Sequence, residues 1–202
     1  MCLFELLLRS AVNNGDGRVQ SICTTFAIID SRPQQQFKKA HLKNAINLMN
    51  DIKFETWLGS IINPDEPFYL IAENETVLNE LIERSAKIGY EKQIVLAFVA
   101  DFGNTEMKPF DSSALQNNED AYTIIDIRNH SEVKTNKIFA NALHIPLHEL
   151  RERTNEIPLH KPIVVHCAGG YRSAAGSSII KSKLSGTSQV FDLSEGVKTF
   201  QK

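Results

Sequence analysis

The amino-acid sequence predicts an α/β fold of two similar domains, each a small parallel sheet flanked by helices. Two observations predict it. The chain contains an internal repeat, and its predicted strands are apolar throughout, as expected for strands covered by helices on both faces of a sheet. A length of 202 residues also suits two domains of about 100 residues each.

The repeat consists of three pairs of matching segments in the same order. The pairs are FAIIDSR at 26–32 with YTIIDIR at 122–128, NAINL at 44–48 with NALHIPL at 141–147, and PFYLIAENE at 67–75 with PIVVHCAGG at 162–170. A helical pattern follows the last segment of each repeat, ending near Gly89 in one half and at Gly186 in the other. Each half therefore predicts alternating strands and helices, with parallel strands joined by right-handed crossovers.

The polar stretch 103–120 contains the boundary between the halves, and we place the domains at 1–105 and 106–202. Within this stretch, Asp111 is expected to cap a short helix that begins at Ser112. The opening segment MCLFELLL has no basic residues before it, unlike a signal peptide, and we expect it to form a packed amphipathic helix.

Composition excludes several classes of function. A net charge of −2 gives no reason to expect nucleic acid or an anionic membrane as a partner, and no stretch reaches the roughly 18 apolar residues of a spanning helix. The three cysteines, Cys2, Cys23 and Cys167, form no CxxC pair, which suits a reducing, cytoplasmic setting. The histidines form no metal-binding motif, so we expect no metal site, and we assign Cys2 and Cys23 no function.

Cys167 lies at a position where a ligand-binding or catalytic site is expected. It directly follows the predicted strand 163–166, and a helix is predicted to begin near Ser173. In open α/β sheets, ligands bind at the carboxyl ends of strands, and a loop entering a helix aims several backbone N–H groups at one point. Gly169 and Gly170 are expected to supply positive φ values and close approach.

Positive potential at this loop would come from the helix dipole and from Arg172. This potential favours the thiolate, the nucleophilic form of a cysteine, so Cys167 is predicted to attack a substrate. The alternative is a buried structural cysteine, the usual state of a free cysteine.

The segment VVHCAGGYRSAAG at 164–176 resembles the active-site loop of rhodanese (sulfurtransferase) domains, which has the pattern C-x-x-G-x-R. The resemblance continues in IIDIRNHSEV, NALHIPLHEL and SEGVKTF, which are similar to that family's D-x-R-x-x-x-E, GA-x-x-IP and GG-x-x-x-W segments. The first half resembles a second rhodanese domain. The pair is similar to the rhodanese domains at the C-terminus of metallo-β-lactamase-fold proteins, which are associated with persulfide oxidation; the lactamase-fold half is not in this sequence.

The sequence departs from the family pattern at three places. Asn136-Lys137-Ile138 replaces Gly-His-Ile and Phe200 replaces a tryptophan, and we expect both changes to affect packing. In the first half, Ala72 occupies the cysteine position and is followed by ENETVL, without glycine or arginine. The resemblance therefore implies that the first domain is catalytically inactive.

A cysteine phosphatase loop, H-C-x5-R, is the competing interpretation of His166-Cys167. Four residues separate Cys167 from Arg172, where that loop has five. A shorter loop encloses a smaller pocket, suited to a terminal sulfur atom and not to a tetrahedral phosphate. A third interpretation is a non-catalytic tandem module for interaction or redox sensing.

The resemblance implies a sulfurtransferase that works by double displacement and needs no cofactor. Cys167 would take a sulfane sulfur from thiosulfate or a glutathione persulfide and pass it to a thiol or another thiophilic acceptor. A metallo-β-lactamase-fold persulfide dioxygenase, as a domain or a protein, is a possible partner in persulfide or hydrogen sulfide metabolism.

The resemblance also assigns roles to residues around the loop. The catalytic residues are Cys167 and Arg172; substrate-binding residues are Ala168, Gly169, Gly170, Tyr171 and Ser173; structural support comes from Asp126, Arg128, Glu132 and His166. Three roles stay open at this point. Arg172 either binds the donor or braces the loop, Tyr171 points at the pocket mouth or into packing, and His166 tunes the thiolate or forms a structural hydrogen bond.

Overall fold

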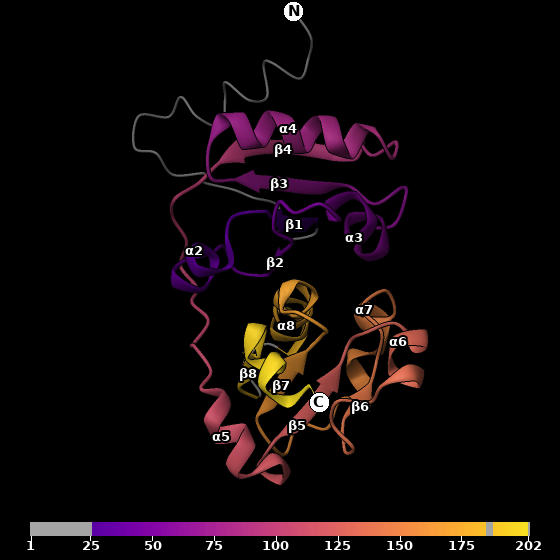
Figure 1. The fold of residues 1–202 in the computed structure, drawn as a ribbon. Coiled ribbons are helices and arrows are strands. Elements are labelled where there is room, and N and C mark those ends of the chain that lie inside the picture. Colours follow the sequence, from indigo (N-terminus) through magenta and orange to yellow (C-terminus); the bar gives the residue numbers. More distant parts are fainter. Residues whose placement is uncertain (1–25, 185–187, 202) are drawn as a thin grey trace, which may run out of the picture.

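The structure, a computed structural model, describes residues 26–184 and 188–201. The segment MCLFELLL, Cys2, Cys23 and Gly186 lie outside the described residues. The described chain forms two four-stranded parallel sheets with strand orders β2-β1-β3-β4 and β6-β5-β7-β8, one above the other in Figure 1. The predicted fold class, two α/β domains with helix-flanked parallel sheets, is confirmed.

The strands and helices follow the predicted alternation. In the first half they are β1 (Ala27–Asp30), α2 (Gln34–Lys39), β2 (Ala45–Asn47), α3 (Phe54–Ile61), β3 (Phe68–Ala72), α4 (Glu75–Ala86) and β4 (Ile94–Val99). In the second half they are α5 (Ser112–Asn117), β5 (Thr123–Asp126), α6 (His130–Thr135), β6 (Leu143–His144), α7 (Leu150–Arg153), β7 (Ile163–His166), α8 (Tyr171–Leu184) and β8 (Val190–Asp192). Short 3-10 helices add η1 (Glu119–Ala121), η2 (Thr154–Glu156) and η3 (Ser194–Phe200).

The helix α5 begins as predicted, because the Asp111 side chain accepts a hydrogen bond from the Ser113 N–H at 2.9 Å. The polar segment before it leads from one sheet to the other (Figure 1). The domain bounds at 1–105 and 106–202 stay a prediction.

Strand register places equivalent residues of the two domains at the same point of each sheet. Asp30, the last residue of β1, pairs with Ile71, and Asp126, the last residue of β5, pairs with His166. The next residues along the neighbouring strands are Ala72 and Cys167. The backbone thus gives Ala72 the position in the first sheet that Cys167 has in the second.

Helix α8 lies between the domains. Small residues dominate its first half, and its buried residues lie on every side of the helix. A Cβ at Gly176 would lie 2.6 Å from the Ile127 Cδ1 atom, so glycine lets α8 approach its own sheet. On the other side, the Ser178 hydroxyl accepts the Asn47 N–H of β2 at 3.0 Å.

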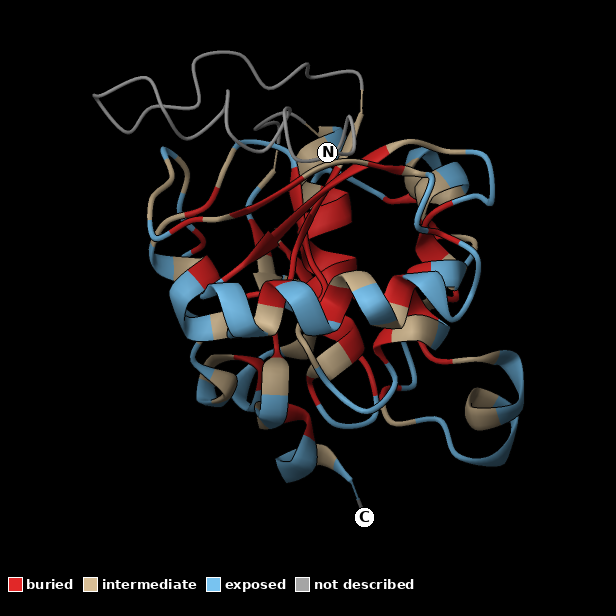
Figure 2. Cartoon of the chain, turned by 90° about the horizontal axis from the view of Figure 1, so that it is seen from above, coloured by how far each residue is buried: buried red, intermediate tan, exposed pale blue. Residues whose placement is uncertain are grey.

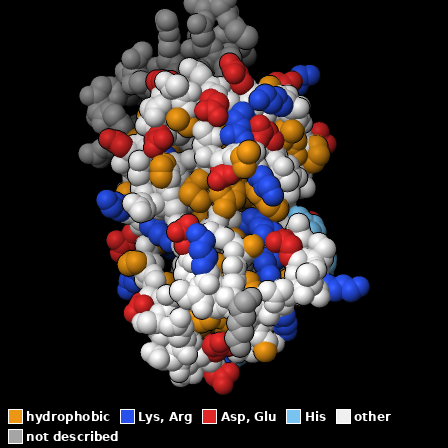
Figure 3. Space-filling view, viewed as in Figure 1, with side chains coloured by type: hydrophobic (Ala, Val, Ile, Leu, Met, Phe, Trp, Pro, Cys, Tyr) orange, Lys and Arg blue, Asp and Glu red, His pale blue; other side chains and the backbone are white. Residues whose placement is uncertain are grey.

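The two domains share one hydrophobic core. It contains Ile29 and Trp57 of the first domain together with Val165, Cys167 and Ile179 of the second. Figure 2 shows the strands almost wholly buried, with the exposed residues on the outer faces of helices and on loops. On the face shown in Figure 3, hydrophobic side chains gather at the level where the domains meet, with Lys and Arg side chains beside them.

Each domain also has a separate core on the face away from this junction. In the second domain the partly buried Phe200 packs against that core, with its ring centroid 4.8 Å from that of Phe139. This packing is the expected consequence of a phenylalanine at the position where the family pattern has tryptophan. Among the residues that the structure describes, no helix is both long enough and apolar enough to cross a membrane.

Candidate active site

The candidate site begins at the carboxyl end of β7, where Cys167 follows His166. Helix α8 begins at Tyr171, two residues before the predicted Ser173. The Gly170 N–H donates a hydrogen bond to the Cys167 Sγ at 3.1 Å, and Cys167 is only 1% exposed. A backbone donor at the start of a 14-residue helix stabilises negative charge on the sulfur.

Only one of the two predicted loop glycines has a positive φ. Gly170 has φ +101°, and a Cβ there would lie 2.9 Å from the Glu195 nitrogen and the Ser194 carbonyl carbon. Gly169 has no positive φ, and a Cβ there would meet nothing within 4 Å. The expectation was therefore wrong for Gly169, because the tight turn and the close approach both fall on its neighbour.

Three further predicted loop residues differ in what they contact. The Ser173 hydroxyl is buried and donates to the Gly170 carbonyl at 2.9 Å, which holds the loop onto the first turn of α8. The Ala168 carbonyl accepts a hydrogen bond from the Gln201 side chain at 2.6 Å. Ala168 and Gly169 are exposed, so this part of the loop faces solvent.

Arg172 forms a two-point ion pair with Glu132, with Nη1 and Nη2 lying 2.6 and 2.7 Å from the carboxylate oxygens. These hydrogen bonds are the main reason that the pKa of Glu132 falls to about 2. Glu132 also accepts the Asn129 N–H at 2.9 Å, which fixes the start of α6. Of the two roles left open for Arg172, this geometry favours bracing the loop.

Asp126 and Arg128 pair with each other at the end of β5. Arg128 donates through Nε and Nη2 at 3.0 and 2.6 Å. In the first domain, Arg32 donates to Asp30 in the same way at 2.9 and 2.6 Å. Because the same pair occurs in the domain whose cysteine position is alanine, it supports the predicted structural role.

His166 is buried below the loop. Its Nε2 lies 3.6 Å from the Asp126 carboxylate, too far for a hydrogen bond, and has no hydrogen-bond partner among the described residues. Burial lowers the pKa of His166 to about 4. The ring is therefore neutral near pH 7, and it adds no positive charge beside Cys167.

Tyr171 points into packing against the first domain, not at an open mouth. Its hydroxyl donates to the Met49 carbonyl at 2.6 Å, and burial raises the pKa of this phenol. The indole of Trp57, on α3, lies over the guanidinium of Arg172 at 5.0 Å from Cζ to the ring centroid. The first domain thus covers both residues that follow Gly170.

A second contact from the first domain reaches the segment above Gly170. The Lys38 ammonium lies 3.0 Å from the Asp192 carboxylate and donates to the Ser194 hydroxyl at 2.9 Å. The Gln34 side-chain amide also donates to Asp192. Since Ser194 contacts Gly170, α2 braces the loop from its far side.

Sequence reasoning missed these contacts from the first domain. Trp57 lies in the middle of α3, and neither its spacing nor its neighbours in the sequence indicate that it meets residue 172. At the position equivalent to Cys167, Ala72 is buried, and the Asn74 side chain caps α4 by accepting the Val77 N–H at 3.0 Å. Within the described chain, no group of three or more His, Cys, Asp or Glu residues is placed to hold a metal ion.

Comparison with known proteins identifies the family of both halves of the chain. The family profile described as "Rhodanese-like domain" matches residues 13–97 and 111–202. The uncharacterized protein YqhL of Bacillus subtilis is 31% identical over 75 residues, which are 37% of this chain and 57% of that protein. The match therefore spans little more than half of that relative's length.

Three solved structures are similar to this chain. A rhodanese-related protein from Thermoplasma volcanium is 26% identical with a TM-score of 0.40, covering 46% of this chain and 89% of its own. A thiosulfate sulfurtransferase from Pseudomonas aeruginosa is 19% identical with a TM-score of 0.35, covering 84% and 38%. The 3-mercaptopyruvate sulfotransferase SseA from Escherichia coli is 13% identical with a TM-score of 0.36, covering 84% and 92%. Because the family profile matches most of both halves, the chain belongs to the rhodanese-like domain family and carries two such domains.

Proposed function

We propose that this chain is a sulfurtransferase that carries a sulfane sulfur on Cys167, from thiosulfate or a glutathione persulfide to a thiophilic acceptor. The observation that carries the proposal is the Gly170 N–H at 3.1 Å from the Cys167 Sγ, at the N-terminus of α8. This arrangement stabilises the thiolate before reaction and the terminal sulfur of the persulfide after it.

The first step is an attack of the Cys167 thiolate on the outer sulfur of thiosulfate. A new sulfur–sulfur bond forms at Cys167 while the bond inside thiosulfate breaks, and sulfite leaves with the electron pair. With glutathione persulfide as donor, the leaving group is the glutathione thiolate. In the second step, cyanide or a thiolate takes the outer sulfur, giving thiocyanate or a new persulfide and restoring the Cys167 thiolate.

The residues around the loop serve this chemistry in different ways. Gly170 presents its N–H to the sulfur, and Ser173 holds the Gly170 carbonyl. Arg172, fixed by Glu132, braces the loop. Because Cys167 is almost wholly buried, a donor reaches the sulfur only when the exposed loop residues or the covering first domain are displaced.

The same burial favours a second candidate, a non-catalytic tandem module for interaction or redox sensing. A cysteine at 1% exposure behaves as a core residue unless the surrounding structure opens. No observation in the structure favours the cysteine phosphatase, and the loop of four residues between Cys167 and Arg172 opposes it.

The cysteine content supports the location of the reaction, and the family resemblance supports its partner. We propose a cytoplasmic location, in which thiols stay reduced. The proposed source of the persulfide chemistry is a metallo-β-lactamase-fold persulfide dioxygenase, either fused to these domains or separate. Co-purification of such an enzyme with the full chain would support the association.

The test is intact-protein mass spectrometry after incubation with thiosulfate or glutathione persulfide, beside the variant Cys167→Ser. That variant keeps Cys2 and Cys23, so it is a matched control for non-specific sulfur uptake. We expect the wild type alone to gain one sulfur atom and to lose it on addition of cyanide or glutathione. No gain from either donor, with Cys167 reduced and reactive to alkylating agents, would overturn the proposal and direct the search to phosphatase substrates and binding partners.

A further inference from the structure

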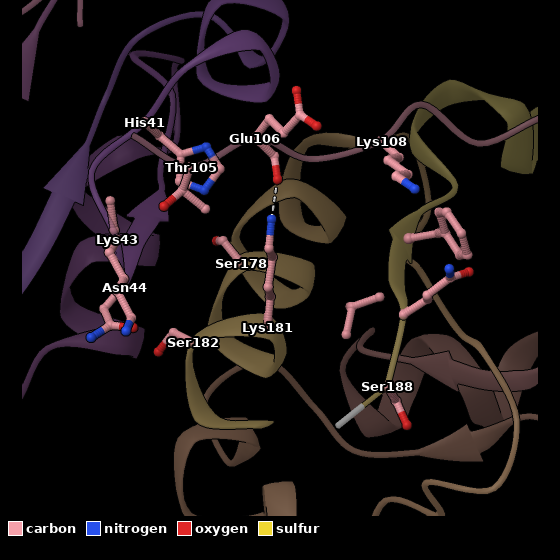
Figure 4. A pocket seen from close by; sticks show the side chains of 14 residues that line it. His41, Lys43, Asn44, Thr105, Glu106, Lys108, Ser178, Lys181, Ser182 and Ser188 are labelled. Carbon is pink, nitrogen blue, oxygen red and sulfur yellow. Dashed lines mark hydrogen bonds between the residues drawn. The ribbon is translucent and has the colours of Figure 1, made fainter. Parts of the chain in front are cut away.

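A cavity lies between the two domains, away from Cys167. Its volume is about 340 Å³, and no residue of the loop 167–173 lines it. Its walls come from 41–45 of the first domain, the linker at 105–108, the middle of α8, and β8 with the residues before it (Figure 4). Small-molecule sites in proteins have volumes of roughly 300–1,000 Å³ and occur preferentially at domain junctions.

The charged groups of this cavity favour an anion. Three lysines line it, Lys43, Lys108 and Lys181, against one carboxylate, that of Glu106. Figure 4 shows the Glu106 carboxylate turned away from these residues, while its backbone carbonyl accepts a hydrogen bond from the Lys181 ammonium. Burial lowers the pKa of Lys181, so a bound anion would stabilise the charge of this partly buried ammonium.

His41 offers the cavity a hydrogen-bond acceptor. Its Nδ1 lies 2.7 Å from the Phe37 carbonyl, and because a carbonyl only accepts, Nδ1 carries the proton. Burial lowers the pKa of His41, so the ring is neutral near pH 7 and Nε2 presents a lone pair. None of the described residues forms a hydrogen bond to Nε2. The ring is held in place by stacking on Phe37, with the centroids 4.0 Å apart.

The rest of the lining is mixed: three side chains are hydrophobic and six are polar, namely Asn44, Thr105, Ser178, Ser182, Ser188 and Gln189. The hydrophobic surface comes from Ala45, at the start of β2, and from Val190 and Phe191, in β8. A hydrated inorganic ion would gain nothing from such a surface. An organic molecule with an apolar body would bury area against it, at about 25 cal/mol per Å².

We propose that this cavity binds a small organic anion that carries a hydrogen-bond donor. Its carboxylate lies between Lys108 and Lys181, its apolar body lies on Val190 and Phe191, and its hydroxyl or amide N–H donates to the His41 Nε2. Such a ligand contacts both domains and the linker between them, so its binding stabilises their arrangement. The site uses no residue of the sulfur chemistry, and the inference stands whether or not Cys167 is catalytic.

The experiment is isothermal titration calorimetry of the full chain with phenyllactate, which combines a carboxylate, a hydroxyl and a phenyl ring. Phenyllactamide, which differs by the loss of the charge, is the matched ligand control. Lys108→Met and Lys181→Met remove one ammonium each, while Lys183→Met changes an exposed lysine of the same helix that does not line the cavity. Circular dichroism checks that each variant is folded.

We expect phenyllactate to bind the wild type and Lys183→Met equally, and each cavity variant about tenfold more weakly, because one ion pair is lost. Phenyllactamide should bind more weakly than phenyllactate by a similar factor. 3-Phenylpropionate should also bind more weakly than phenyllactate, because it lacks the hydroxyl that donates to the His41 Nε2. Cys167→Ser should bind like the wild type. Equal binding of the acid and the amide, retained binding in Lys108→Met and Lys181→Met, or no heat with any carboxylate at millimolar concentration would overturn the proposal.

Discussion

The indole of Trp57 lies over the guanidinium of Arg172, at 5.0 Å from Cζ to the ring centroid, although the two residues belong to different domains. Glu132 holds the edge of the same guanidinium through two hydrogen bonds. A ring on the face and a carboxylate at the edge together fix the orientation of an arginine. The domain that has Ala72 at the cysteine position therefore supplies part of the support for the Cys167 loop.

Trp57→Ala should lower sulfur transfer, measured as thiocyanate formed from thiosulfate and cyanide. A cation–π contact contributes about 1 kcal/mol when partly buried, so we expect a loss of roughly fivefold. Trp57→Phe should recover part of the activity, since it keeps a ring over Arg172. Ile52→Ala, at a position 88% exposed in the same domain, is the control and should match the wild type. Equal activity of the alanine and phenylalanine variants would contradict a positioning role for the ring.

Gly170→Ala and Gly169→Ala form a matched pair in the loop. At Gly170, with φ +101°, a methyl group would meet the Ser194–Glu195 backbone at 2.9 Å, so the loop must shift and the N–H must leave the sulfur. Strain of this kind costs about 1–3 kcal/mol. We expect Gly170→Ala to lose both sulfur uptake and thermal stability, and Gly169→Ala to keep both, as measured by mass spectrometry and calorimetry. If Gly170→Ala kept the sulfur uptake and thermal stability of the wild type, the turn at Gly170 would not be required.

Glu132→Gln should change how stability depends on pH. The pKa of Glu132 is about 2 in the folded chain against an ordinary value of about 4.5, so its pairing stabilises the fold above pH 4.5 and this contribution is lost as pH falls toward 2. Water screens this half-buried carboxylate, and we expect a contribution of about 1–2 kcal/mol. Urea unfolding should show that the difference between wild type and Glu132→Gln shrinks across this window. A constant difference would mean that the pair does not depend on the charge of Glu132.

Much of the fold follows from local pattern. Apolar runs ending in Asp-x-Arg mark β1 and β5, and the repeat predicts two sheets of the same topology because each half contains every strand its sheet needs. The loop at Cys167 is predictable for the same reason, because its strand, cysteine, glycines and helix follow one another directly in the sequence. Local order along the chain was enough to predict these features.

The contacts between the domains were not predictable in this way. Trp57 and Arg172, or Lys38 and Asp192, meet only because the domains pack on α8, and no periodicity encodes that packing. The wrong expectation for Gly169 has the same cause. The motif contains two glycines, but only the tertiary structure shows which one lies against another backbone segment. Contacts of high sequence separation need the tertiary structure.

His166 should stay neutral down to low pH. Burial lowers its pKa to about 4, against about 6.5 in an unfolded chain, so the unfolded state takes up a proton first as pH falls. Stability from the neutral ring is therefore complete above pH 6.5 and is lost as pH falls toward 4, by about 3 kcal/mol at most. NMR titration of the imidazole should show no protonation above about pH 5, and His166→Asn should remove this part of the pH dependence of unfolding. A pKa near 6.5 would contradict this, because the ring would then become a cation beside Cys167 below about pH 6.5.

A thiol at the equivalent position of the first domain should not carry sulfur. In the double variant Ala72→Cys with Cys167→Ser, the new thiol would stand at the end of β3, in the register position equivalent to Cys167, but Glu73 and Asn74 replace the glycine-containing turn. The Asn74 side chain already accepts the Val77 N–H at the start of α4, and the Glu73 carboxylate opposes a neighbouring thiolate. We expect no gain of sulfur from thiosulfate by mass spectrometry, while the wild type gains one atom at Cys167. Sulfur uptake at position 72 would show that a strand-end cysteine before a helix is sufficient, and that the turn at Gly170 is not what makes the second domain reactive.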